Sequence, residues 1–291
     1  MRRYCFVILA ALCATAASAQ SAPQNLPAAI YTDPPADAAH PAKMTVLHIP
    51  SYGVLINGLV YSPPGAGPHP TLVICHGLPG NEKNLDLAQA VRRAGWNAVT
   101  FNYRGSWGSP GTFRFAQNIE DADSVLAFLR DPANAKSLGV DTHRIVIAGH
   151  SMGGWVTVIV AAHDHGLIGA ILISAADMSA VLDEPHKKLV AMMADDMESL
   201  AGVTAESMAD DLRATGKPFR FENAVPGLAQ VPLLVITSND GLAPQNDALV
   251  HAIQAKGGLK VTETHFATDH SYSHKRIALE SAVIRWLADL H

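Results

Sequence analysis

The sequence predicts one α/β domain, in which helices cover both faces of a mostly parallel β-sheet. Short apolar runs typical of buried strands alternate with helical patterns along most of the chain. Of the 291 residues, 48% are hydrophobic and 16% are charged, which is enough apolar material for a large core. The formal net charge of −5 is small, so neither a nucleic acid nor an anionic membrane is expected as a partner.

Residues 1–19 have the pattern of a secretory signal peptide. Arg2 and Arg3 form a basic start, and the apolar run at residues 5–14 is shorter than the ~20 residues that a membrane-spanning helix needs. Residues 17–19 are all small and match a cleavage site. We therefore expect a periplasmic or secreted protein with no stable membrane anchor after cleavage. Cleavage would leave Cys75 as the only cysteine, which we expect to be buried and unreactive.

Residues 20–43 are rich in alanine and proline and predict an extended leader before the first strand. Two β-like runs follow at residues 45–48 and 54–61, and the turn between them at residues 51–53 predicts an antiparallel hairpin. The folded domain is therefore expected to extend from residue 44 to residue 291.

The remaining strands and helices are predicted from alternating patterns beyond the hairpin. Continuous apolar runs suit strands that are buried on both faces of a parallel sheet, and they occupy residues 71–75, 97–102, 144–148, 169–174, 233–237 and 259–264. Helical patterns occupy residues 85–93, 119–130, 152–163, 246–256 and 276–290.

A long stretch at about residues 178–230 interrupts this alternation. A loop of that length without secondary structure would be unusual, so we expect a small helical insertion. It either packs as an appendage or, as its position favours, forms a cap whose methionines offer a flexible surface over the site. The methionines are Met178, Met192, Met193, Met197 and Met208. Whether such a cap moves as a lid stays open at this point.

The strongest local signal is the G-x-S-x-G pattern at residues 149–153, which places Ser151 between a predicted strand and a predicted helix. Such a turn is sharp and strained, and it exposes the serine Oγ at the carboxyl edge of the sheet. The helix N-terminus supplies partial positive charge and free N–H groups where negative charge develops during acyl transfer. We therefore predict Ser151 as a nucleophile.

A serine nucleophile needs a base and an acid that orients the base, and with this turn they follow in the order serine, acid, histidine. Asp240 comes directly after the strand at residues 233–237, at the carboxyl edge of the sheet. An aspartate before Gly241 is also a common turn residue. Its position after the strand favours Asp240 as the acid.

His270 is the predicted base, because it follows the strand at residues 259–264 through a short loop. His265 lies too early, at the end of that strand, and His274 is expected at the start of the last helix. Asp269 is a weaker alternative to the acid predicted above, since a residue adjacent in sequence is poorly placed to orient the imidazole.

Two backbone N–H groups are expected to bind the oxyanion. One is the N–H of Met152, the residue after the nucleophile. The other should come from the loop after the strand at residues 71–75, where Leu78 is the candidate because Pro79 has no N–H. Gly77 and Gly80 would let this loop fold tightly.

From about Met44 to the C-terminus, the chain resembles the α/β-hydrolase superfamily, most of all its dienelactone-hydrolase and prolyl-oligopeptidase-like branches. The matching pieces are His76-Gly77, Asn102-Tyr103-Arg104-Gly105, Gly149-His150-Ser151-Met152-Gly153, Asp240 ahead of Pro244, and Asp269-His270. Dienelactone hydrolases carry a cysteine nucleophile where this chain has serine, which favours ordinary ester or amide hydrolysis. Tyr103 and Arg104 are interpreted as structural before any contact with substrate.

The sequence therefore predicts a serine hydrolase that cleaves carboxylic esters through an acyl-enzyme, with a small-molecule ester or amide as its substrate. An amidase, a peptidase or an acyltransferase could use the same three residues, and a binding protein that uses the cleft without catalysis is the alternative of another class. No metal or organic cofactor is expected, since the pattern at residues 163–165 is too weak for a metal site. The acyl chain, the leaving group and the oligomeric state are not predicted.

Overall fold

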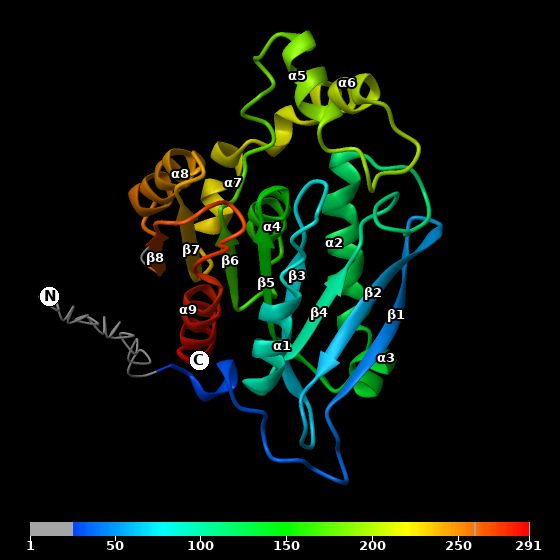
Figure 1. Cartoon of the computed structure of the whole chain (residues 1–291), viewed down its shortest axis with the longest axis vertical. Helices are drawn as coiled ribbons and strands as arrows, with labels where there is room; N and C mark the ends of the chain where they lie inside the picture. Colours follow the sequence, from blue (N-terminus) through cyan, green and yellow to red (C-terminus); the bar gives the residue numbers. More distant parts are fainter. Residues whose placement is uncertain (1–25, 259, 291) are drawn as a thin grey trace, which may run out of the picture.

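The computed structural model describes residues 26–258 and 260–290, so the predicted signal peptide and residues 20–25 of the leader lie outside the described residues. The strands are β1 (Lys43–Ser51), β2 (Val54–Ser62), β3 (His69–Cys75), β4 (Asn97–Phe101), β5 (Val140–His150), β6 (Gly169–Ile173), β7 (Leu233–Ser238) and β8 (Val261–Phe266). Within the described chain they form one sheet in the order β1-β2-β4-β3-β5-β6-β7-β8 (Figure 1). β2 pairs antiparallel with both β1 and β4, and all other neighbours are parallel, which confirms the predicted fold class.

The helices are α1 (Leu85–Arg93), α2 (Phe115–Arg130), α3 (Pro132–Leu138), α4 (Met152–His163), α5 (His186–Ala194), α6 (Ala205–Thr215), α7 (Phe221–Leu228), α8 (Ala243–Ala255) and α9 (Arg276–Ala288), with short 3-10 turns η1 (Ala28–Ile30) and η2 (Lys217–Phe219). The sequence interpretation missed α3. Its signals are local: Asp131 accepts two backbone N–H bonds as the N-cap, a proline begins the helix, and Gly139 ends it in the left-handed conformation. None of the described helices combines the length and the apolar character needed to cross a membrane.

The sheet separates two hydrophobic cores, because successive residues of a strand point to opposite faces. In β3, Val73 and Cys75 belong to the core that α2, α4, α7 and α8 cover, whereas Leu72 and Ile74 belong to the core under α1 and α9. Burying one side chain of the size of leucine stabilises the fold by about 1.5–3 kcal/mol. The sheet that carries the predicted site is therefore packed on both faces.

The strand register brings the loops of the predicted site together. Cys75 at the end of β3 pairs with Gly149 of β5, so the loop after β3 lies beside the turn that holds Ser151. His150 pairs with Ile173 of β6 in the same way.

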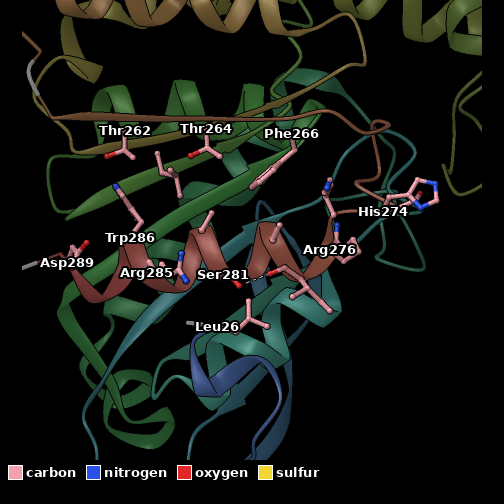
Figure 2. Close-up of a pocket in the computed structure, with 16 residues that line it drawn as sticks. Leu26, Thr262, Thr264, Phe266, His274, Arg276, Ser281, Arg285, Trp286 and Asp289 are labelled. Carbon is pink, nitrogen blue, oxygen red and sulfur yellow. Dashed lines mark hydrogen bonds between the residues drawn. The ribbon is translucent and has the colours of Figure 1, made fainter. Parts of the chain in front are cut away.

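The last strand differs from its prediction in both position and burial. β8 begins at Val261 instead of residue 259, which lies outside the described residues, and its side chains are partly or fully exposed. The reason is that β8 is an edge strand of the sheet. A groove of about 1000 Å³ lies between β8 and α9, where Phe266, Thr264 and Trp286 are among the residues that line it (Figure 2). The described residues that line this groove do not include any of the five predicted site residues, which are Ser151, Asp240, His270, Leu78 and Met152.

The predicted insertion between β6 and β7 consists of α5, α6, η2 and α7. α5 and α6 lie beyond the end of the sheet, at the top of Figure 1. Met193 and Met208 are buried in the packing of the insertion, whereas Met192 is 39% exposed. Met193 and Met208 therefore contribute to the packing of the insertion, not to a flexible outer surface.

Candidate active site

Ser151 occupies the sharp turn between β5 and α4. Its φ of 59° and ψ of −123° lie in a strained region for a residue other than glycine. A Cβ on Gly153 would lie 2.1 Å from the carbonyl oxygen of Cys75, and one on Gly149 would lie 1.9 Å from that of Gly153. Only glycine fits at both positions, so the two glycines of the G-x-S-x-G pattern allow the strained turn to form.

The backbone around Ser151 is fixed on two sides. Its N–H donates to the carbonyl of Ile173 at 3.0 Å, and its carbonyl accepts from the N–H of Ala176 at 3.0 Å. Ser151 is the N-cap of α4, but its side chain makes no capping hydrogen bond. The hydroxyl is therefore not engaged in capping, and it lies where the helix dipole is positive.

Asp240 and His270 come together as predicted. His270 Nδ1 donates to Asp240 Oδ2 at 2.7 Å, and the Asp240 side chain is 5% exposed whereas that of His270 is 39% exposed. Burial by itself raises the pKa of Asp240, but hydrogen bonds, above all from His270 and Ser174, outweigh it and hold the pKa below its ordinary value. The carboxylate is therefore ionised at neutral pH and fixes the proton of His270 on Nδ1.

Three buried hydroxyl groups support this pair, and sequence reasoning missed them. Ser174 Oγ lies 3.1 Å from Ser238 Oγ and 2.8 Å from Tyr272 Oη, and Tyr272 Oη donates to the carbonyl of Ile236 at 3.2 Å. Ser174 directly follows β6 and Ser238 ends β7. A polar residue at the carboxyl end of an apolar strand was the signal that could have found the two serines.

His150 is a further residue whose role the sequence interpretation missed. It is 4% exposed, its ring centroid lies 4.6 Å from that of His270, and its Nε2 donates to the backbone carbonyl of His270 at 2.9 Å. Burial, and next the charge of His270, lower the pKa of His150 to about 4. A neutral ring therefore packs against the predicted base.

The alternative acid and bases have other partners. Asp269 accepts from the N–H and the Oγ of Ser273 at 2.7 and 2.6 Å. His265 contacts Thr237 Oγ1 at 2.9 Å, and also Asn239 Oδ1 at 3.0 Å. His274 lies two residues before α9, so its predicted place within that helix is wrong.

The Gly77–Leu78 peptide lies beside the nucleophile. A Cβ on Gly77 would lie 3.0 Å from Ser151 Cβ and 3.5 Å from Ser151 Oγ. His76 Nδ1 donates to the Gly77 carbonyl at 2.8 Å, and burial lowers the pKa of His76 to about 4, so His76 is neutral. Among the residues that the structure describes, no acceptor binds the Leu78 N–H. That N–H is therefore available to a bound group.

Met152 is the first residue of α4, so its N–H has no acceptor within the helix. Its side chain is 1% exposed and packs in the core. The two predicted oxyanion donors thus come from the ends of the neighbouring strands β3 and β5.

The side chains of Tyr103, Arg104 and Cys75 are buried in the interior of the domain. Tyr103 is fully buried, and Arg104 forms ion pairs of 2.6 Å with both Asp121 and Glu120. Burial raises the pKa of the Cys75 thiol to about 12, which makes it a poor nucleophile. Within the described chain, no group of three or more histidine, cysteine, aspartate or glutamate side chains is placed to hold a metal ion.

Curated proteins match part of this chain. A curated relative, the uncharacterized 31.7 kDa protein in the traX-finO intergenic region of Escherichia coli, is 35% identical over 107 residues, which is 35% of this chain and 36% of the relative. The chain thus spans about a third of the length of the first curated relatives that it matches.

Two solved structures have a similar fold. The thermostable carboxylesterase EstE1, cloned from a metagenomic library, superposes with a TM-score of 0.62 and 23% identity over 87% of this chain and 91% of the esterase. The acylaminoacyl peptidase of Pyrococcus horikoshii gives a TM-score of 0.62 with 17% identity, over 86% of this chain and 41% of the peptidase. The family model described as alpha/beta hydrolase family matches residues 72–276, which is well over half of the chain. The protein therefore belongs to the alpha/beta hydrolase family.

Proposed function

We propose that the protein is a serine hydrolase that cleaves carboxylic esters with Ser151, His270 and Asp240. The observation that carries the proposal is the 2.7 Å hydrogen bond from His270 to the buried carboxylate of Asp240, at the same sheet edge as the strained Ser151 turn. A histidine held in this tautomer presents Nε2 as a base, and a serine in this turn is presented as a nucleophile.

The first half of the reaction forms an acyl-enzyme. His270 Nε2 takes the proton of Ser151 Oγ as Oγ bonds to the ester carbonyl carbon. The carbonyl oxygen becomes an oxyanion, which the N–H groups of Leu78 and Met152 bind. The imidazolium then gives its proton to the leaving alkoxide as the carbon–oxygen bond breaks, and the alcohol departs.

The second half releases the acid. His270 takes a proton from water as the hydroxide oxygen bonds to the acyl carbon, and the same two N–H groups bind the second oxyanion. The proton on His270 passes back to Ser151 Oγ when the bond between acyl carbon and Oγ breaks. These steps use water and groups of this chain.

The likeness to the carboxylesterase EstE1 supports an ester as the first candidate substrate class. The likeness to the acylaminoacyl peptidase supports a peptide as the second candidate. A screen of p-nitrophenyl esters of varied acyl length, run beside peptide amides, separates the two classes. A fluorophosphonate should label the wild-type protein at Ser151, whereas a protein that only binds a ligand would not be labelled. Ser151→Ala should abolish both labelling and turnover without loss of the fold, and retained turnover would contradict the proposal.

We also propose that the protein is exported and that residues 1–19 are removed, on the basis of the basic start, the short apolar run and the small residues 17–19. Expression of the full chain in a Gram-negative host, followed by fractionation and N-terminal sequencing, tests this. A periplasmic protein that begins at Gln20 is expected, and an uncleaved cytoplasmic protein would contradict it.

A further inference from the structure

We infer that Trp107 and Ser199 are positioning residues for the oxyanion donor Leu78, and that the helical insertion thereby supports the rate of the reaction. The inference rests on the proposed function, because it concerns the loop at residues 76–80 that supplies Leu78. We call this segment the oxyanion loop. Neither residue belongs to the motifs that identified the site.

Two side chains from different parts of the chain hold the carbonyl of Pro79. Trp107 Nε1 donates to it at 2.5 Å, and Ser199 Oγ donates to it at 3.0 Å. A carbonyl oxygen has two lone pairs, so these two donors occupy its full hydrogen-bonding capacity. The peptide that follows Pro79 is therefore fixed in orientation.

This carbonyl lies next to the donor that must stay in place. Leu78 stands between Gly77, whose carbonyl binds His76, and Pro79, whose carbonyl binds Trp107 and Ser199. Gly77 O and the Leu78 N–H belong to one planar peptide, so a rotation of that plane would move both. With a carbonyl fixed on each side of Leu78, the direction of its N–H is set before a substrate arrives.

Trp107 is itself held in place. Its φ of 49° lies in the left-handed region, which is costly for a tryptophan. Its N–H donates to the carbonyl of Ser199 at 3.0 Å, and its own carbonyl accepts from Asn102 Nδ2 at 3.3 Å. Lys83 Nζ lies 4.0 Å from the centre of its ring. The indole N–H is thus directed at Pro79 by the surrounding structure.

Ser199 comes from the insertion between β6 and β7, and neighbouring contacts fasten this part of the insertion to the same loops. Leu200 forms a β-bridge with Ser106, and the N–H of Ala201 donates to the carbonyl of Gly105 at 2.8 Å. Asn81, just after the oxyanion loop, donates to Glu198 Oε1 at 2.8 Å. The insertion therefore contacts the oxyanion loop directly instead of only covering the sheet edge.

The two donors share one acceptor, so their effects should not be independent. Loss of a whole oxyanion donor lowers kcat by about 100-fold to 1000-fold in enzymes of this chemistry. Each single variant keeps one donor on Pro79, so we expect kcat to fall about 3-fold to 10-fold for Trp107→Phe and for Ser199→Ala. The double variant should lose more than the product of the single losses.

The test measures kcat and KM of the full chain on its best p-nitrophenyl ester, and the inhibition constant of a trifluoromethyl ketone, which forms an oxyanion adduct with the serine. Trp107→Phe keeps the ring over Lys83 and removes only the donor. We expect kcat to fall while KM stays within twofold, with the inhibitor weakened in parallel. Ser199→Thr keeps a hydroxyl and should restore most of the rate lost in Ser199→Ala.

The matched control is Ser207→Ala, which breaks the capping box of α6 in the same insertion without touching the oxyanion loop. It should lower Tm and leave kcat unchanged. Losses below twofold in the double variant, losses confined to KM, or an equal loss of kcat in Ser207→Ala would overturn the inference. Absence of Ser151-dependent hydrolysis in the wild-type protein would instead overturn the proposed function, and the inference with it.

Discussion

The rings of His150 and His270 pack against each other at a tilt of 35°, and only one of them has a role in the proposed chemistry. Their ring centroids are 4.6 Å apart, and His150 Nε2 donates to the His270 carbonyl at 2.9 Å. Because the pKa of His150 is lowered to about 4 by burial, the ring adds no positive charge beside the imidazolium that His270 becomes. His150 therefore supports the base through packing and one hydrogen bond.

Replacing His150 should slow the reaction without moving its pH dependence. His150→Phe keeps an aromatic ring and removes the donor, so we expect kcat to fall about 3-fold to 10-fold, the equivalent of one hydrogen bond. The acidic limb of kcat/KM against pH should keep its midpoint, because neutral His150 does not titrate there. His163→Phe, at the C-terminal end of α4, is the control and should keep the wild-type rate. A displaced acidic limb in His150→Phe would contradict this account.

Replacing Asp240 should be far more damaging. Asp240→Asn keeps the shape of the side chain, but an amide that donates to Nδ1 moves the imidazole proton to Nε2, where it blocks the base. We expect kcat to fall by about 10⁴-fold. Asp269→Asn is the matched control. Its kcat should stay within a few fold, because among the described residues the Asp269 carboxylate accepts hydrogen bonds only from Ser273 and from its neighbour Thr268. Equal losses in the two variants, measured on one ester, would contradict the proposed role of Asp240 as the acid that orients His270.

Gly77→Ala tests the close approach between the oxyanion loop and the nucleophile. The φ of Gly77 is not in the left-handed region, so alanine is not strained there, but its Cβ would lie 3.0 Å from Ser151 Cβ. We expect kcat to fall about 100-fold, as for loss of an oxyanion donor, with Tm nearly unchanged.

Gly53→Ala is the opposite control for this prediction. Gly53 lies in the β1–β2 turn with a φ of 89° and has no atom near its missing Cβ. Alanine there should lower the free energy of unfolding by about 1 kcal/mol through backbone strain and leave kcat unchanged. Full activity in Gly77→Ala would show that the oxyanion loop does not need its present distance from Ser151.

Glu280 makes stability depend on pH. It is 7% exposed, and burial together with the negative charge of Asp86 raises its pKa from 4.5 to about 7. Between these values the folded protein holds a proton that the unfolded chain releases, so the free energy of unfolding falls as the pH rises through this range. Glu280→Gln should leave stability at pH 4 unchanged and raise it at pH 8 by about 1 kcal/mol, since solvent screening reduces the full electrostatic effect.

Denaturant unfolding of wild type and Glu280→Gln at both pH values measures this difference. Glu263→Gln, on the exposed face of β8, is the control and should show the wild-type dependence. The same dependence on pH in Glu280→Gln would show that another group causes it.

Sequence reasoning could predict Ser151, Asp240 and His270 as site residues because their signals are local. Each follows an apolar run, and the order of strands in a parallel sheet brings the ends of such runs together. The same reasoning chose Asp240 over Asp269, and the structure pairs Asp240 with His270.

The contacts that support the site are not local, which is why they were missed. His150 contacts a residue 120 positions away, and so does Ser199 through its bond to Pro79. No periodicity or spacing encodes such pairs. The limits of β8 were misplaced for a related reason, because an edge strand has no continuous apolar run to define its ends.

The bond from Ser199 to Pro79 also limits how this chain can be re-engineered. Exchanging the insertion for that of another hydrolase is an obvious way to alter the choice of substrate. Such a graft would discard the hydroxyl at residue 199, which donates to the Pro79 carbonyl. A transplanted segment therefore has to supply its own donor to Pro79 if the chimaera is to keep its turnover.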